Sequence, residues 1–342
     1  MGERMKDGIS RRAVLGGGAA AAVIIGTPLL MRANALDYKP AVTGRPAPGR
    51  SAFGRDSTAE EVTAGMDLSG RTALVTGCNS GLGLETMRVL AMRGAHVIGA
   101  ARTGEKAETA CASVEGKTTP LIVELTDLPG IVTAAAQVAA MDTPIDMLVL
   151  NAGIMALQEL RTANGVEMQF AVNHLGHFLL ANRLLEQVVA ADAGRVVVVS
   201  SRAHGWAPTE GIQFDNLDGS RGYDPWQAYG QSKVANGLFS RELARRLADT
   251  NATSNSLHPG VIDTNLSRHL PPRDPDADTS HLKSIPQGTA TQCYVATSPD
   301  LDRVTGYYFS DCNPAEPKAT MQDDDMAAKL WAVSEELVAD YL

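Results

Sequence analysis

A regular alternation of short apolar runs with longer helical stretches constrains this chain most strongly. Strand-like runs occupy residues 72–76, 96–101, 121–125, 146–150, 195–200, 253–258 and 305–309. Helical patterns lie near 82–93, 127–141, 165–190, 227–249 and 287–297, and a closing one covers 323–341. Runs that are apolar along their whole length indicate strands buried on both faces of a parallel sheet. We therefore predict an α/β fold: one doubly wound domain with a seven-stranded parallel sheet and helices on both faces.

Composition narrows the class of protein further. The chain has 342 residues, of which 44% are hydrophobic, so a substantial core is available and disorder is excluded as the main state. A net charge of −9 with no long basic run argues against a nucleic-acid partner. The four cysteines, Cys78, Cys111, Cys293 and Cys312, show no CxxC spacing, so no metal site is expected.

The first 35 residues have the pattern of an export signal. Ser10-Arg11-Arg12 precedes an apolar run at 13–31, and Ala33-Asn34-Ala35 offers a small-x-small cleavage site. This pattern predicts a twin-arginine signal peptide at 1–35, engagement of the twin-arginine export machinery while the protein is folded in the cytoplasm, and a periplasmic or otherwise exported location. The alternative is a transmembrane anchor, although Gly, Ala and Pro28 interrupt the run.

The next segment, 36–66, precedes the predicted sheet. Residues 36–56 are rich in Pro, Gly and Arg and are expected to form an arm without regular structure. Ser57-Thr58-Ala59-Glu60 reads as a capping box for a short helix. The dinucleotide-binding and catalytic domain would then span 67–342.

A glycine-rich turn follows the first predicted strand. Its residues are Gly77, Cys78, Asn79, Ser80, Gly81, Leu82 and Gly83, and a helical pattern begins at its end. Glycines at this spacing let the backbone turn tightly and approach a pyrophosphate, which binds at the helix N-terminus. The strand–turn–helix context favours a dinucleotide site over a plain glycine turn.

The end of the second predicted strand indicates which dinucleotide binds. A cofactor with a free ribose 2′-OH requires a carboxylate about 20 residues after the loop. Ala101 occupies that place and Arg102 follows it. A guanidinium suits a 2′-phosphate, so we predict NADP(H) rather than NAD(H).

Four polar residues form the candidate catalytic group. Tyr229 and Lys233 are four residues apart at the start of a helical pattern, so they share one face of the helix. An ammonium group near a phenol would lower the phenol pKa toward a useful range. Ser201 closes a predicted strand, and Asn173 is an amide within an apolar helical stretch. We expect these side chains to meet at the carboxyl edge of the sheet, where ligands of such folds bind.

These motifs together resemble the short-chain dehydrogenase/reductase superfamily. The glycine turn, Asn151-Ala152-Gly153, the helix asparagine, the strand-end serine, the Tyr-x-x-x-Lys pair and His258-Pro259-Gly260 occur in the family's order across 57–342. Within it, the chain resembles the branch of retinol dehydrogenases and WW-domain oxidoreductases. The resemblance implies a Rossmann fold and an oxidoreductase that interconverts a carbonyl and an alcohol.

The resemblance also implies residue roles. Tyr229 would be the general acid/base, Lys233 would tune it and bind the nicotinamide ribose, Ser201 would hold the substrate oxygen, and Asn173 would hold a proton-relay water. The implied cofactor-binding residues are Gly77, Asn79, Ser80, Gly81, Leu82, Gly83, Arg102, Glu124, Leu125, Asn151, Ala152, Gly153, Tyr229, Lys233, Pro259, Gly260, Ile262 and Thr264. Glu124-Leu125 stands where the family often has Asp.

Several alternatives and expectations complete this interpretation. A nucleotide-binding sensor or scaffold without turnover and a reductase of C=C bonds are the competing functions. Loops 202–228 and 265–285 would select a small-molecule carbonyl or alcohol substrate. Helices 165–190 and 227–249 are the family's usual surface for a homodimer.

The export signal leads to a further expectation. If the nucleotide crosses the membrane inside the folded domain, the 265–285 loop and the 36–56 arm are the segments expected to cover it. Turnover would then need two substrates used in alternation.

Overall fold

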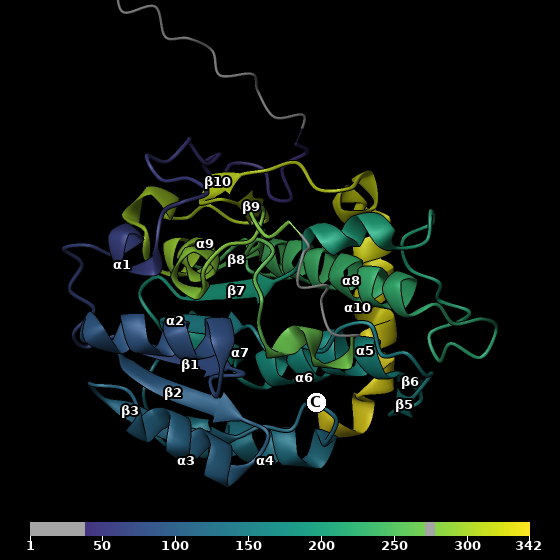
Figure 1. The fold of residues 1–342 in the computed structure, drawn as a ribbon, viewed down its shortest axis with the longest axis horizontal. Helices are drawn as coiled ribbons and strands as arrows, with labels where there is room; N and C mark the ends of the chain where they lie inside the picture. The colour runs from purple at the N-terminus through teal and green to yellow at the C-terminus, as the bar shows by residue number, and fades with distance from the viewer. Residues whose placement is uncertain (1–37, 271–277) are drawn as a thin grey trace, which may run out of the picture. The chain divides into compact units, whose positions relative to one another are not determined.

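The computed structural model describes residues 38–270 and 278–342, and a central sheet runs through them (Figure 1). The strand order is β10-β9-β8-β7-β4-β1-β2-β3. The strands are β1 (Thr72–Thr76), β2 (His96–Ala101), β3 (Thr118–Ile122), β4 (Met147–Leu150), β7 (Arg195–Val199), β8 (Thr253–His258), β9 (Tyr308–Ser310) and β10 (Asn313–Pro314). Seven run parallel, as predicted, and the two-residue β10 pairs antiparallel with β9.

Two strands lie outside their predicted bounds. β3 begins at Thr118 rather than 121 and contains Pro120, which an edge strand tolerates because one side of its backbone has no partner. β9 begins at Tyr308 rather than 305, after Gly306, which adopts a φ of +80°. The residues that belong to these runs but not to the strands are mostly buried: Val123 and Leu125 after β3, and 305–307 before β9.

Helices cover both faces of the sheet because alternate strand residues enter two separate cores. Leu74 of β1 packs with one face, whereas Ala73 and Val75 pack with the other. The first core also takes residues from α4 (Leu128–Ala139), α6 (Gly176–Arg183), α8 (Pro225–Arg246) and α10 (Asp324–Leu337). The second takes residues from α1 (Ala59–Val62), α2 (Gly81–Met92), α3 (Gly104–Ala112) and α9 (Ile285–Thr297). The predicted doubly wound architecture is thus confirmed.

The predicted helix at 165–190 is wrong as a single element. A small hairpin, β5 (Thr162–Ala163) and β6 (Val166–Glu167), comes first, and Asn164 and Gly165 make its turn at φ of 53° and 77°. The short α5 (Met168–Phe170), a π-helical turn η1 (Ala171–Leu175), α6 and α7 (Leu185–Val189) follow. Helix α3 was not predicted from the sequence.

The faces expected to support a homodimer are largely covered within the chain. Residues 229–244 of α8 are all buried, as are residues 176–181 of α6. Helix α10 lies alongside α8 (Figure 1), where Arg241 pairs with Asp324 at 2.8 Å. This arrangement removes α8 as an open surface for a second copy.

The arm is irregular, as predicted, and its described residues bond to the C-terminal part of the chain. The Tyr38 hydroxyl donates to the Gly306 carbonyl at 2.5 Å, and the Arg45 guanidinium donates to the Ala248 carbonyl at 2.8 Å, beyond the end of α8. Further along, the Ser51 hydroxyl donates to the Cys312 carbonyl at 2.8 Å. The arm therefore follows the β9–β10 edge of the sheet (Figure 1), and its end reaches the 265–285 loop, where the Arg55 guanidinium donates to the His281 carbonyl at 2.8 Å.

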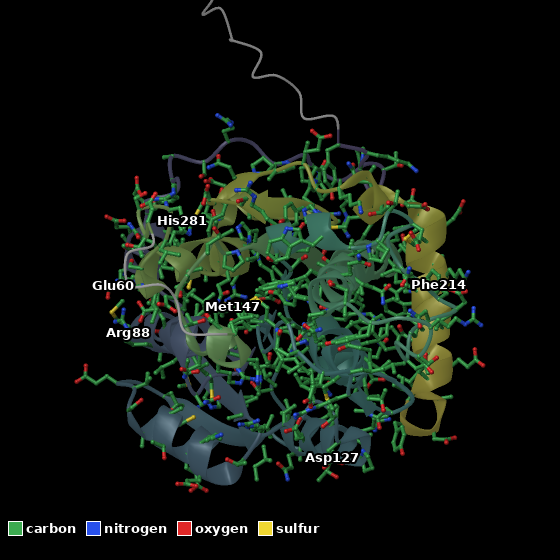
Figure 2. The ribbon with its side chains drawn as sticks, turned by 45° about the vertical axis from the view of Figure 1, so that its right-hand side comes forward. Glu60, Arg88, Asp127, Met147, Phe214 and His281 are labelled. Atoms are coloured by element: carbon green, nitrogen blue, oxygen red, sulfur yellow. The ribbon has the colours of Figure 1, made fainter. Side chains whose placement is uncertain are left out.

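Helix α1 joins the arm to α2. Its capping box uses Thr58 and Glu61, one residue later than predicted. Arg88 of α2 reaches Glu60 at 2.6 Å (Figure 2). The predicted export signal at 1–35 lies outside the described residues. Within 38–270 and 278–342, no helix has the length and apolar character needed to cross a membrane.

Candidate active site

The glycine turn opens directly from the end of β1. The backbone N–H groups of Gly77 and Cys78 donate to the Ala100 carbonyl at 2.8 and 3.1 Å, which places the turn beside the end of β2. Gly77 adopts a φ of +71°. At Gly83, a Cβ would collide with the Gly77 carbonyl and lie 2.6 Å from the Asn151 amide nitrogen. Glycine is therefore required where α2 approaches the turn.

The first turn of α2 has the features of an anion site. Ser80 is the N-cap, yet its side chain makes no capping hydrogen bond, so the first N–H groups of this 12-residue helix keep their capacity to bind a phosphate. Gly81 adopts a φ of +55°. A nucleotide pyrophosphate fits this combination of free donors, helix dipole and close glycine backbone.

The end of β2 supplies positive charge. Ala101 is buried and Arg102 is exposed directly after it. Arg268 of the turn η3 (Asn265–His269) lies near enough that its pKa is lowered, first by burial and then by the charge of Arg102. Arg102 and Arg268, from distant segments of the chain, therefore lie near one another at the end of β2.

Glu124 and Leu125 follow β3 as irregular residues. The Glu124 carboxylate accepts from the Thr126 hydroxyl at 3.1 Å. Leu125 is buried, and its backbone closely approaches Gly176 of α6.

The Thr76 hydroxyl connects the glycine turn to the Asn151-Ala152-Gly153 segment. It accepts from the backbone N–H groups of Asn151 at 2.9 Å and Ala152 at 3.0 Å. His177 Nε2 lies 2.9 Å from the same hydroxyl, and its Nδ1 lies 3.1 Å from the Asn173 carbonyl. Because a carbonyl only accepts, Nδ1 carries the proton, and Nε2 accepts from Thr76. Burial lowers the pKa of His177 to about 4, consistent with a neutral ring.

Asn173 sits in the π-helical turn η1 rather than in a regular helix. Its side-chain oxygen accepts from the Ile154 N–H at 2.9 Å, and its amide donates to the Ile154 carbonyl at 3.0 Å and to the Ser232 hydroxyl at 2.9 Å. These bonds satisfy a fully buried amide and fix η1 against both the β4 loop and α8. Single π turns recur at functional sites.

Tyr229 and Lys233 share one buried face of α8. The Lys233 ammonium lies 5.5 Å from the centre of the Tyr229 ring and donates to the Val199 carbonyl at 3.1 Å. Burial raises the pKa of Tyr229 to about 12, with the Ser201 side chain acting in the opposite direction, and burial lowers the pKa of Lys233 to about 8. Desolvation is the largest cause at Tyr229, so the pKa of the phenol lies above its ordinary value rather than below it.

Ser201 lies between β7 and the turn η2 (Arg202–Trp206). Its hydroxyl accepts from the Ala203 N–H at 3.1 Å, which fixes its rotamer at the strand end. Gly230 lets η2 pack against α8, since a Cβ there would lie 2.8 Å from the Ala203 carbonyl oxygen. The serine is thereby held beside Tyr229.

The segment after β8 closes the site from the other side. Gly260 adopts a φ of +115° after Pro259. Ile262 packs on Gly288 of α9, and the Thr264 methyl lies 3.4 Å from the position of a Cβ on Gly81. The structure therefore brings the predicted site residues to the carboxyl ends of β1, β2, β3, β4, β7 and β8 and to the helices that adjoin them.

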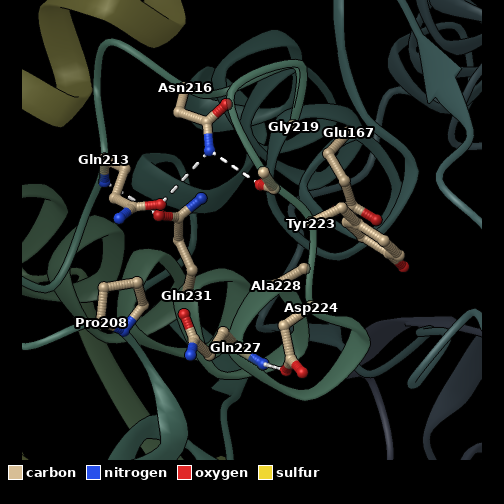
Figure 3. Close-up of a pocket in the computed structure, with 11 residues that line it drawn as sticks. Glu167, Pro208, Gln213, Asn216, Gly219, Tyr223, Asp224, Gln227, Ala228 and Gln231 are labelled. Carbon is tan, nitrogen blue, oxygen red and sulfur yellow. Dashed lines mark hydrogen bonds between the residues drawn. The ribbon is translucent and has the colours of Figure 1, made fainter.

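The predicted loop at 202–228 surrounds the start of α8. Trp206 and Trp226 meet edge to face with ring centres 5.2 Å apart, and both are exposed. A small polar pocket lies between this loop and the first turns of α8 (Figure 3). There the Gln213 N–H donates to the Gln231 side chain at 2.8 Å, which anchors the loop to the helix.

Sequence reasoning missed several residues of this region. Ser232 bonds Asn173, His177 bonds Thr76, and the buried Gln292 of α9 donates to Thr86 and contacts Asn151. Ser232 lies inside the Tyr-x-x-x-Lys motif, but the other two have no local signal. In the described part of the chain, the four cysteines are free and buried, and no group of three or more His, Cys, Asp or Glu is placed to hold a metal.

Comparison with known proteins places this geometry in a family. The profile described as short chain dehydrogenase matches residues 71–274. The chain is 43% identical to a chloroplastic short-chain dehydrogenase, TIC 32 B of Brassica napus, over 87% of this chain and 97% of that protein. It is 39% identical to retinol dehydrogenase 14 of Mus musculus over 79% and 86% of the two chains. It is 35% identical to the human WW domain-containing oxidoreductase over 86% and 74%.

A solved structure agrees with the fold. An uncharacterized protein from Mycobacterium paratuberculosis superposes with a TM-score of 0.68 at 35% identity, covering 81% of this chain and 97% of that one. The predicted resemblance to retinol dehydrogenases and WW-domain oxidoreductases is confirmed at the level of family, as is the Rossmann-like sheet.

Proposed function

The chain belongs to the short-chain dehydrogenase/reductase family, an NAD(P)-dependent class of oxidoreductases acting on CH–OH groups, and from that premise we propose that it interconverts a carbonyl and an alcohol with NADP(H), using Tyr229 as the acid/base. The observation that carries this proposal is the group of Asn173, Ser201, Tyr229 and Lys233 beside the glycine turn, in which Ser201 is partly exposed and the other three side chains are buried. A protein that only binds nucleotide has no need of this group.

Each side chain has a distinct part in the proposed reaction. The bound nucleotide supplies or accepts the hydride. Tyr229 keeps its proton at neutral pH, since its pKa lies near 12, and can donate it to a carbonyl oxygen held by Ser201. Lys233, with a pKa of about 8, places a positive charge 5.5 Å from the centre of the Tyr229 ring. Asn173 holds the turn η1 in place through its hydrogen bond with Ile154.

A single substitution tests this role. Tyr229→Phe should reduce turnover about a hundred- to ten-thousand-fold, because the proton donor is lost, and should leave nucleotide binding nearly unchanged. Tyr307→Phe is the matched control, since Tyr307 is also buried but stacks on Tyr38, away from the site. Normal turnover of Tyr229→Phe on any accepted carbonyl would exclude Tyr229 as the acid/base.

Product analysis separates the competing functions. A C=C reductase would yield the saturated carbonyl from an α,β-unsaturated aldehyde, whereas the proposed reaction yields the unsaturated alcohol. A sensor or scaffold would bind nucleotide and yield neither. The tyrosine–serine arrangement at the strand end supports the alcohol product.

We also propose export of the folded protein, on the strength of Ser10-Arg11-Arg12 and the apolar run that follows. Folding before export allows the nucleotide to be loaded in the cytoplasm and carried across. Replacing both Arg11 and Arg12 by Lys should then abolish export, and protein purified from the periplasm should retain nucleotide after desalting. Unchanged export of the double variant would remove the twin-arginine interpretation.

A further inference from the structure

We propose that Lys283 and Asp311 are positioning residues for the nucleotide: their ion pair fixes the segment 260–264 over the start of α2. This inference rests on the proposed function, in which Ile262 and Thr264 of that segment contact the cofactor. Lys283 belongs to no motif of the sequence, and the two residues lie on separate elements.

Lys283 passes directly beneath the turn that follows β8. Its backbone N–H donates to the Val261 carbonyl at 2.9 Å, and it forms an isolated parallel bridge with Ile262. A Cβ on Gly260 would lie 2.6 Å from the Lys283 Cδ atom, so the lysine stem occupies the space that any other residue at 260 would need. Glycine at 260 therefore both permits the positive φ and leaves room for the lysine stem.

The Lys283 ammonium has one hydrogen-bond partner among the described residues, the Asp311 carboxylate. The two atoms are 2.5 Å apart, and the lysine side chain is only 4% exposed, whereas that of Asp311 is 43% exposed. A buried ammonium that loses its partner is costly to keep in place. His258 lies near the pair, but its Nδ1 already accepts from the Arg202 N–H at 3.2 Å, so its Nε2 carries the proton and cannot accept from Lys283 in place of Asp311.

Asp311 is itself held by an unusual turn. Asp311 and Cys312 form the two-residue hairpin between β9 and β10, and both have positive φ, 52° and 59°, although neither is glycine. Such strain persists where surrounding contacts determine the conformation. Here the Cys312 N–H donates to the Thr291 hydroxyl at 3.2 Å, and the Asn313 amide donates to the Asp311 carbonyl at 2.8 Å.

The arm completes this chain of contacts. The Ser51 hydroxyl donates to the Cys312 carbonyl, and the Asn313 amide donates to the Phe53 carbonyl, each at 2.8 Å. The arm thus buttresses the hairpin that presents Asp311 to Lys283. Through this hairpin, the arm contributes to the position of the segment 260–264.

The loss expected from breaking the pair is in nucleotide affinity rather than in chemistry. Ile262 packs on Gly288 and Thr264 lies against Gly81, so a displaced segment no longer meets the nucleotide, whereas the catalytic side chains on α8 keep their own hydrogen bonds. Asp311→Asn should weaken NADPH binding and raise its dissociation rate about tenfold, while kcat at saturating NADPH changes little. Lys283→Met, which keeps the stem under Gly260 and removes the buried charge, should show the same weakening.

The experiment compares these variants with an ion pair away from the site. Asp324→Asn is the matched control, because Asp324 pairs with Arg241, 1% exposed, at 2.8 Å beside α10. NADPH fluorescence gives the dissociation constant and rate, and thermal melting gives stability. We expect both Asp324→Asn and Asp311→Asn to lower the melting temperature, but only Asp311→Asn to weaken NADPH binding, with Asp311→Glu restoring it in part.

Two results would overturn the proposal in distinguishable ways. If the wild-type chain binds NADPH and both Asp311→Asn and Lys283→Met bind it equally well, the ion pair does not position the segment, and the proposed function stands. If the wild-type chain binds neither NADPH nor NADH, the proposed function fails and this inference fails with it.

Discussion

Replacing Lys233 by Met should stabilise the protein while it removes activity. The folded chain buries this ammonium and lowers its pKa from 10.5 to about 8. At 1.36 kcal/mol per pKa unit, the charged side chain costs the folded state about 3 kcal/mol at pH 7. Methionine has a similar volume and carries no charge. The lost hydrogen bond to the Val199 carbonyl matters little, because Asn236 also donates to that oxygen at 3.1 Å.

The pH dependence of this gain has a fixed sign. Below pH 8 the lysine is protonated in both the folded and unfolded states, so the wild-type chain bears the full penalty. Between pH 8 and pH 10.5 the unfolded chain binds a proton that the folded chain has lost, so wild-type stability from this group rises with pH. The advantage of Lys233→Met should therefore shrink across that window.

Thermal melting from pH 7 to pH 10.5 measures both effects. A net gain of about 2–3 kcal/mol corresponds to about 3–5 °C for a chain of this length. Lys329→Met is the control, since that lysine is exposed over Phe214 and should change the melting temperature little. A Lys233→Met variant no more stable than wild type at pH 7, or a difference constant from pH 7 to 10.5, would refute the reasoning.

Two further substitutions test the nucleotide site. Arg102→Ala should weaken NADPH binding by about 1.5–3 kcal/mol through loss of a charged hydrogen bond and leave NADH nearly unchanged, and calorimetric titration showing equal losses would contradict the choice of cofactor. Gly83→Ala should abolish nucleotide binding and lower stability, because the added Cβ would press on the Gly77 carbonyl and lie 2.6 Å from the Asn151 amide, whereas Gly54→Ala, with nothing within 4 Å, should be silent in the same assays.

Local pattern was sufficient to predict the framework. The bounds of β1, β2 and β8 agree with the strand-like runs. Nearly all residues of these strands are buried, the polar ones of β8 included, as expected for strands in the middle of a parallel sheet. The predicted motif residues meet at one edge because parallel strands share a direction. The pattern failed at 165–190, because the Asn164-Gly165 turn places a hairpin before the helix. A short apolar run is compatible with either a strand or a helix, so periodicity alone did not separate the two.

The sequence by itself determined the parallel sheet, the glycine turn and the identity of the candidate catalytic residues, since each is written in the spacing of neighbouring residues. Only the tertiary structure decided the protonation of Tyr229 and Lys233, because burial depends on how completely the surrounding elements exclude water. It alone brought Tyr38 to Gly306, 268 positions away, and Lys283 to Asp311. Contacts of this kind join residues that no local period relates, and packing of the whole chain fixes their geometry.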